Sequence, residues 1–242
     1  MSLPLFADSS VDASADASVI SHQSLDRALV EQFLAQASGP LVFEHCAFDS
    51  EDLEGIELRG ATFRSCTFVG ARLDRAALTG SSWLRCRAGG AAFELSDLTD
   101  AKFEGCDLSN TNWRRARLSG AAFAEVKLTG AKFTEAQTLG MSLRESLAVN
   151  ADLRGLSFRK QTVVGMNLSG ADLAGCDFTD AVLVDCDLSD ASLKNARFAR
   201  ADLRRAKLGA IQAGDLLQHF KGSIISAEQA AEIVAGLGVQ VI

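Results

Sequence analysis

The sequence of 242 residues predicts an all-β solenoid whose backbone winds as a spiral with four sides of five residues each. The first observation is a large apolar residue at every fifth position from Phe43 to Leu208, since 30 of these 34 positions hold Leu, Phe or Trp. The second is a small residue, mostly Ala, Cys or Ser, two places before each large one. A period of five fits neither an α-helix nor a lone strand. It fits a coil that turns after every fifth residue and points both patterned positions inward.

Four sides of five residues close one turn in 20 residues, so residues 20 apart should stack. Phe43, Phe63 and Trp83 fall on one such column, and Cys46 and Cys66 fall on another. With neighbouring strands about 4.8 Å apart, the repeats would form about 8.5 coils and a rod of about 41 Å. No insertion shifts the phase across the repeat region, residues 41–210. The exceptions at the large position are Ala88, Thr138, Ala148 and Val163.

Two segments precede the repeats. Residues 1–19 are rich in Ser, Asp and Ala without periodicity, which is typical of a disordered tail. Residues 20–40 contain helical spacing, with Ser24 as a candidate N-cap. This helix would cover the apolar end of the solenoid, because stacked coils need a cap at each end. Pro40 stands directly before the first coil and no Pro follows it, as an unbroken hydrogen-bonded ladder requires.

Residues 211–242 should form the second cap and a dimerisation segment. Ser226 followed by Gln229 is a capping-box pattern, so a helix should begin there and end near Gly236 or Gly238. Residues 239–242 are apolar and predict a short strand, which most simply pairs with a second copy in a symmetric end-to-end dimer. The alternative is that this strand folds back on its own helix. The residues expected at the dimer contact are Ile233, Val234, Leu237, Val239, Val241 and Ile242.

Composition argues against several classes of function. Three His and no Tyr leave little material for acid–base catalysis, and no phosphate-binding or nucleophile-elbow motif is present, so neither an enzyme nor a catalytic residue is predicted. The net charge of −7 argues against a protein that coats nucleic acid. No signal-peptide pattern or membrane-length apolar run is visible. We therefore expect a cytoplasmic protein with no membrane partner, no cofactor and no small-molecule substrate.

The six Cys residues suggest a metal site only by their number. All of them occupy the small inward position, and their spacing lacks the short intervals of zinc motifs. Small buried side chains are therefore predicted, with a metal site or a disulfide as the alternative. The six are Cys46, Cys66, Cys86, Cys106, Cys176 and Cys186.

Several five-residue units resemble the consensus of pentapeptide-repeat proteins, in outline Ala-(Asp/Asn)-Leu followed by two variable residues. Examples are residues 151–155 (ADLRG), 171–175 (ADLAG) and 201–205 (ADLRR). The resemblance covers most of the chain, the whole of the repeat region from position 41 to position 210. It implies that the solenoid is a right-handed quadrilateral β-helix.

A narrower resemblance, to particular groups within this family, depends on two further features. They are the C-terminal helix with its short apolar segment, and Cys-x-Phe units such as residues 46–48 and 66–68. These features are similar to the quinolone-resistance pentapeptide group and the related albicidin-resistance type. That resemblance implies a non-enzymatic, DNA-mimicking homodimer that binds DNA gyrase or topoisomerase IV and protects it from poisons, as antibiotic resistance or self-immunity. The chain carries no loop between coils and is closer to the loopless members. The alternative is a generic repeat scaffold or effector with an unrelated partner.

Charge along the repeats offers one candidate surface for such a partner. Residues 1–40 hold one basic and five acidic residues and residues 209–242 hold one and three, which leaves the repeats with a net charge of only −1. An acidic run is nevertheless followed by a basic one. The acidic run predicts either a partner-binding acidic belt or solvated turn positions, where Asp can hydrogen-bond its own turn. The belt is Asp172, Asp177, Asp180, Asp185, Asp187 and Asp190, and the basic band is Lys194, Arg197, Arg200, Arg204, Arg205 and Lys207.

Overall fold

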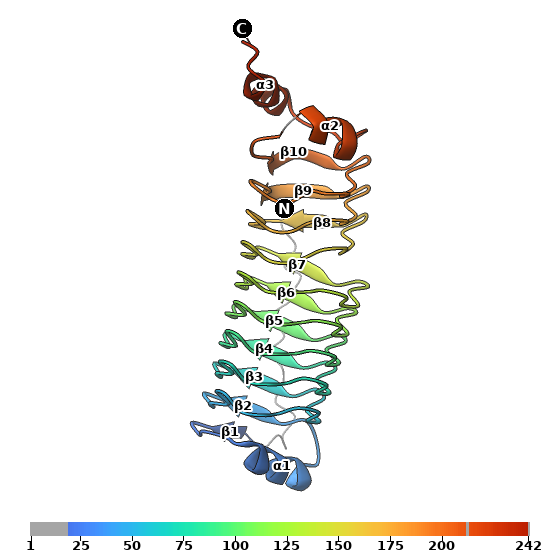
Figure 1. Ribbon diagram of the computed structural model, residues 1–242. Helices are drawn as coiled ribbons and strands as arrows, with labels where there is room; N and C mark the ends of the chain where they lie inside the picture. Colours follow the sequence, from blue (N-terminus) through green and yellow to red (C-terminus); the bar gives the residue numbers. More distant parts are fainter. Residues whose placement is uncertain (1–18, 212, 242) are drawn as a thin grey trace, which may run out of the picture.

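The computed structural model describes residues 19–211 and 213–241 as a rod of stacked coils with helical caps at both ends (Figure 1). A ten-stranded parallel sheet runs along the rod with its strands in chain order, on one side of a β-solenoid of about nine turns. The strands are β1 (Val19–Ser21), β2 (Val42–Glu44), β3 (Thr62–Arg64), β4 (Ser82–Leu84), β5 (Lys102–Glu104), β6 (Ala122–Ala124), β7 (Ser142–Arg144), β8 (Thr162–Val164), β9 (Val182–Asp187) and β10 (Asp202–Lys207). The helices are α1 (Arg27–Gln36), α2 (Ala213–His219) and α3 (Ala227–Gly236).

Residues 20 apart lie next to one another in successive coils, as the sequence period predicts. In the sheet, Phe43 pairs with Phe63, and Phe63 pairs with Trp83. On the other three sides single bridges repeat with the same step, for example from Asp52 to Arg72. The predicted right-handed quadrilateral β-helix is therefore confirmed, and no loop interrupts the order of strands from β2 to β10.

The inward positions form a continuous core along the axis. Of the 34 large positions, 32 are buried, and only Thr138 and Leu193 are half-buried. Aromatic rings stack from coil to coil, with 4.8 Å between the ring centroids of Phe103 and Phe123 at an interplanar angle of 4°. Each buried side chain of this size contributes about 1.5–3 kcal/mol before the entropy cost of ordering it. The core thus ties each coil to its two neighbours.

The N-terminal cap begins with an additional partial coil. Strand β1 pairs in register with β2, and Ile20 and Leu25 are buried at the large positions of this coil. The segment 20–40, predicted to hold a capping helix, therefore begins with the end of a strand that was not predicted. Ile20 pairs with Phe43, and not with Pro40 as the regular period would require, because helix α1 lengthens the step between these two coils. The partial coil raises the number of turns from the predicted 8.5 to about nine.

Helix α1 begins later than the sequence predicted. The Asp26 side chain accepts a hydrogen bond from the backbone N–H of Leu29 at 2.9 Å, so Asp26 is the N-cap. Ser24, the predicted N-cap, instead forms a parallel bridge with Ala47. Residues 1–18, almost all of the predicted tail, lie outside the described residues.

The C-terminal cap also continues the coil. After helix α2, which was not predicted, the chain returns to the solenoid and the ring of Phe220 stacks on Phe198 at 4.9 Å and 3°. The predicted capping box of α3 is present. Its Gln229 side chain also donates to the carbonyls of Leu203 (2.8 Å) and Ala206 (2.6 Å). Carbonyls of the last coil thus find partners although no full coil follows.

None of the helices in residues 19–211 and 213–241 has the length and apolar character that a membrane span requires.

Candidate functional site

The predicted acidic belt lies in the last coils of the rod, directly beside the basic band. Four of its six aspartates form ion pairs with the residue 20 positions later, in the next coil. These pairs are Asp177–Arg197 (2.9 Å), Asp180–Arg200 (2.6 Å), Asp185–Arg205 (2.7 Å) and Asp187–Lys207 (3.1 Å). Asp172 lies 3.6 Å from Arg154 in the preceding coil. In the described part of the chain, Asp190 is the belt member without an ion pair.

The pairing follows from the repeat, because a basic run that comes one turn of the spiral after an acidic run lies on the next coil. The sequence showed both runs, and applying the period of the repeat to the charges would have shown their pairing. Most of the belt's charge is therefore balanced within the protein, and the belt is not an open acidic surface. The turn interpretation also holds for several members, since Asp172, Asp177 and Asp187 accept from the backbone N–H two residues later. A role of the belt in binding a partner stays a prediction.

Asp177 is the most strongly held member of the belt. Its side chain is buried and accepts from the backbone N–H of Thr179 at 3.0 Å and from Arg197 Nη2 at 2.9 Å. Burial by itself would raise the pKa of the Asp177 carboxyl. The hydrogen bonds and the Arg197 charge outweigh burial and lower the pKa to about 2. The carboxylate is therefore ionised over the whole range of ordinary pH.

The Asp177→Asn variant should be less stable than the wild type at pH 7, by about 1 kcal/mol for a pair with one solvent-exposed partner. A lowered pKa in the folded state stabilises the protein above the unfolded pKa near 4, and this stabilisation is lost as the pH falls toward 2. The difference in melting temperature between wild type and variant should therefore shrink from pH 4 to pH 2. Circular-dichroism melts measure it, with Asp190→Asn as the matched control. Equal melting of the two variants at pH 7 would contradict the expectation.

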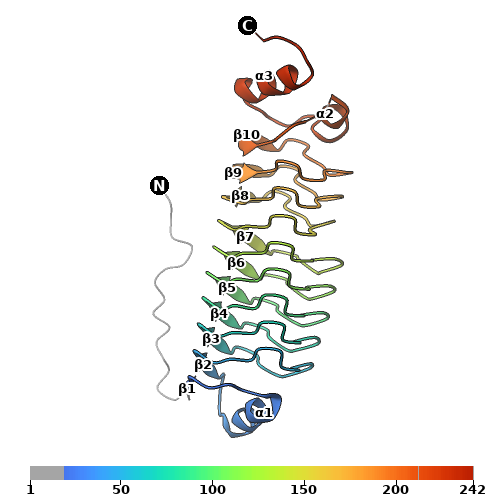
Figure 2. The same cartoon turned by 60° about the vertical axis from the view of Figure 1, so that its left-hand side comes forward.

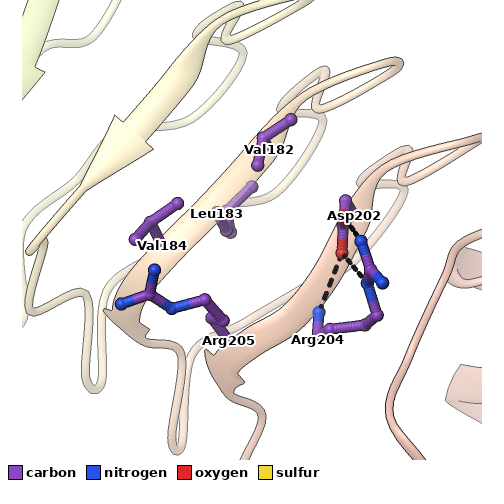
Figure 3. A pocket seen from close by; sticks show the side chains of 6 residues that line it. All are labelled: Val182, Leu183, Val184, Asp202, Arg204 and Arg205. Atoms are coloured by element: carbon purple, nitrogen blue, oxygen red, sulfur yellow. Dashed lines mark hydrogen bonds and ion pairs between the residues drawn. The ribbon is translucent and has the colours of Figure 1, made fainter. Parts of the chain in front are cut away.

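A shallow groove lies between the last two strands of the sheet. Asp202 pairs with Val182 but Arg205 pairs with Val184, so the register between β9 and β10 is irregular. The groove has a volume of about 310 Å³, and its floor is Val182, Leu183 and Val184 (Figure 3). Arg204 on its rim folds back onto Asp202, with hydrogen bonds of 2.6 and 2.9 Å. The one carboxylate of the lining, that of Asp202, is held by Arg204, and the rest of the lining is apolar or cationic.

The cysteines and histidines occupy positions in the repeat and the caps. All six Cys are buried, so the interpretation as small core side chains is confirmed. Burial raises the pKa of the Cys176 thiol to about 12, which keeps it neutral and unreactive. The rings of His22 and His45 stack at 4.9 Å, and His219 ends helix α2 at the other end of the rod. Across residues 19–211 and 213–241, no three His, Cys, Asp or Glu side chains are placed to hold a metal ion.

The C-terminal end presents an apolar surface beyond the last coil. Figure 2 shows α3 lying past β10, at the opposite end from α1. Val239 and Val241 are 54% and 53% exposed, and Val234 and Leu237 are exposed beside them. A groove of about 590 Å³ separates α3 from the terminal segment and is lined by Ala231, Glu232, Ala235, Val239, Gln240 and Val241. Residues 239–241 pair with no strand in the described chain, so the predicted strand is not formed within one copy.

One predicted dimer residue has a different place. Ile233 is buried and belongs to the core that α3 forms with the last coil, so it anchors the cap instead of facing outward. The exposed part of the predicted contact is Val234, Leu237, Val239 and Val241, and Ile242 lies outside the described residues.

The described chain is thus a capped β-solenoid with no loop between coils from β2 to β10 and with an exposed apolar surface at its C-terminal end. One family model, described as a pentapeptide repeat region, matches residues 41–113. A second family model, which describes eight copies of the pentapeptide repeat, matches three segments, residues 96–136, 151–190 and 171–209. The chain belongs to the pentapeptide-repeat family.

Three solved structures of QnrB1, a plasmid-mediated fluoroquinolone resistance protein, share the fold. One trypsin-treated variant has 22% sequence identity and a TM-score of 0.73, with 83% of this chain and 100% of that chain covered. A second has 22% identity and a TM-score of 0.71, with 82% and 99% covered. Full-length QnrB1 has 20% identity and a TM-score of 0.70, with 83% and 100% covered. Among curated protein sequences, none matches this chain.

Proposed function

We propose that the protein is a non-enzymatic partner of DNA gyrase or topoisomerase IV that protects the enzyme from topoisomerase poisons. The observation that carries the proposal is the likeness of 83% of this chain to full-length QnrB1, which is covered over 100% of its length at a TM-score of 0.70. The absence of loops between coils from β2 to β10 makes the rod itself the contact surface. Its place of action would be the cytoplasm, where its target works.

The active form in this proposal is an end-to-end dimer. Nine steps of about 4.8 Å give each rod a length of about 43 Å, so two rods would span about twice that. The exposed apolar residues at the C-terminal end supply the contact, because an apolar terminal segment gains most by pairing with a second copy. The dimer would present a long, narrow body of the kind that a duplex-binding groove accepts.

The charge distribution supports a second candidate function, that of a generic repeat scaffold. DNA mimicry needs an acidic surface, because a duplex-binding groove is basic. The ion pairs from Asp177 to Arg197 and from Asp185 to Arg205 balance much of the belt. A mixed surface of this kind also suits a generic repeat scaffold whose partner is another protein.

A gyrase supercoiling assay with a quinolone poison separates the two functions. We expect the wild-type protein at micromolar dimer to restore supercoiling in the presence of the drug, or to inhibit gyrase without it. Binding should weaken steeply with salt, since charged groups would carry the contact. No rescue and no inhibition at that concentration would refute the topoisomerase proposal and favour the scaffold.

A further inference from the structure

The stacking of coils is interrupted at one corner of the rod, between residues 136–142 and residues 156–162. Bridges run from Asp97 through Arg117 to Gln137 and resume from Ser157 to Asp177, but in the described chain none joins Gln137 to Ser157. Strands β7 and β8 keep one paired position, whereas β6 and β7 pair at three positions and so do β8 and β9.

Backbone hydrogen bonds show the same opening. In the preceding coil, Leu118 N–H donates to Gln137 O at 2.8 Å and Gly120 N–H donates to Leu139 O at 2.9 Å. The equivalent N–H groups of Thr138 and Gly140 make no backbone hydrogen bond to the next coil in the described chain. The Gln161 side chain crosses the gap and donates to Met141 O at 3.3 Å. A long side-chain bond thus takes the place of the regular ladder.

The adjoining corner stays tight. Glu145 N–H donates to Val164 O at 2.7 Å, and Asn167 N–H donates to Ser146 O at 2.9 Å. A Cβ added at Gly165, which has a φ of +63°, would lie 3.2 Å from Glu145 Cα, so the two backbones touch there. The coils therefore separate at one corner and remain in contact at the next, which is a wedge and not a uniform gap.

The side chains at this level explain the wedge. Thr138 stands at a large inward position and is only half-buried, while Leu139 beside it is 85% exposed. Met141, Leu156 and Gln161 stand at small inward positions that elsewhere hold mostly Ala, Cys or Ser. Underfilled large positions lose dispersion contacts and overfilled small ones hold the coils apart. The family-model matches also stop at residue 136 and resume at residue 151.

We propose that this wedge is a hinge that divides the rod into two rigid parts, residues 41–135 and 163–208. In a solenoid each coil contacts only its neighbours, so one weak interface can open while the others stay closed. The Arg144–Val164 pairing is the pivot, and opening occurs at residues 136–142. The hinge lets the rod change its bend along one direction. The proposal rests on the rod's geometry alone and holds whichever partner binds.

Hydrogen exchange measured by mass spectrometry tests the local opening. Amides of residues 137–142 should exchange at least about tenfold faster than those of residues 117–122, one coil earlier. The variant Thr138→Leu/Met141→Ala/Leu156→Ala/Gln161→Ala restores the repeat pattern and should bring the exchange of 137–142 down to that of 117–122. Val126→Ala, a small-position change in an unbroken coil, should leave the exchange of 137–142 unchanged. Equal exchange of the two segments in the wild type would overturn the hinge.

Spin-label distances test the bending without depending on the pattern-restoring variant. Labels at Thr79→Cys and Ser119→Cys are two coils apart on one side of the wedge, and labels at Ser119→Cys and Arg159→Cys are two coils apart across it. The native thiols are buried and should stay unlabelled. We expect a broader and longer distance distribution for the second pair. Coinciding distributions would show that the rod is rigid there, and neither result depends on topoisomerase binding.

Discussion

Replacing Trp113 by alanine is expected to lower the free energy of unfolding by about 3–5 kcal/mol. The side chain is fully buried in a middle coil, and its ring stacks on Phe93 at 4.3 Å and on Phe133 at 5.8 Å. Its Nε1 also donates to Thr111 Oγ1 at 2.7 Å. Alanine removes these contacts and leaves a cavity that three coils share. Because coils are stabilised by their neighbours, the loss should extend beyond residue 113.

Urea unfolding followed by far-UV circular dichroism measures this loss without relying on tryptophan emission, which the substitution itself changes. Trp113→Phe should recover most of the stability, since the same column accepts Phe at the coils on both sides. Leu139→Ala is the matched surface control and should change the free energy of unfolding by less than about 0.5 kcal/mol. A loss below about 1 kcal/mol for Trp113→Ala would mean that the aromatic column does not carry the stability of the rod.

The sequence predicts the repeat region well because each coil repeats one local rule. The stacking of Phe43 on Phe63 follows directly from the period of the repeat. The same rule fails at the two ends, where the steps from Ile20 to Phe43 and from Phe198 to Phe220 are both longer than that period. Helices α1 and α2 interrupt the step there, and a search with a fixed period does not detect these partial coils.

The candidate site is less predictable because its properties depend on neighbours in space. The aspartates were visible as an acidic run, but their neutralisation depends on residues such as Arg197 in the next coil. Ile233 had the right character for a dimer contact, yet the docking of α3 against the last coil buries it. The wedge depends on Thr138, Met141, Leu156 and Gln161 acting together, and no one of these departures from the repeat pattern predicts it alone.

Removing residues 239–242 is expected to convert a dimer into a monomer, the largest effect that the proposal of end-to-end assembly predicts. Val239 and Val241 are about half exposed in one copy, and they line one side of the groove whose other side is α3. A second copy would cover these side chains and pair the segment's backbone groups. Sedimentation equilibrium should show about twice the chain mass of 25.6 kDa for the full chain and the single mass for the truncated one.

Loss of the dimer can be separated from loss of the cap. Gln229 bonds to the carbonyls of Leu203 and Ala206, and Ile233 packs into the core, so α3 keeps its anchors in the truncated chain. The truncated chain should therefore retain its helical signal and melting temperature at matched concentration, apart from the contribution of dimerisation itself. Val182→Asp, which changes an exposed apolar residue on the sheet, should remain dimeric. A full chain that sediments as a monomer would refute the assembly, and would leave each rod to act alone.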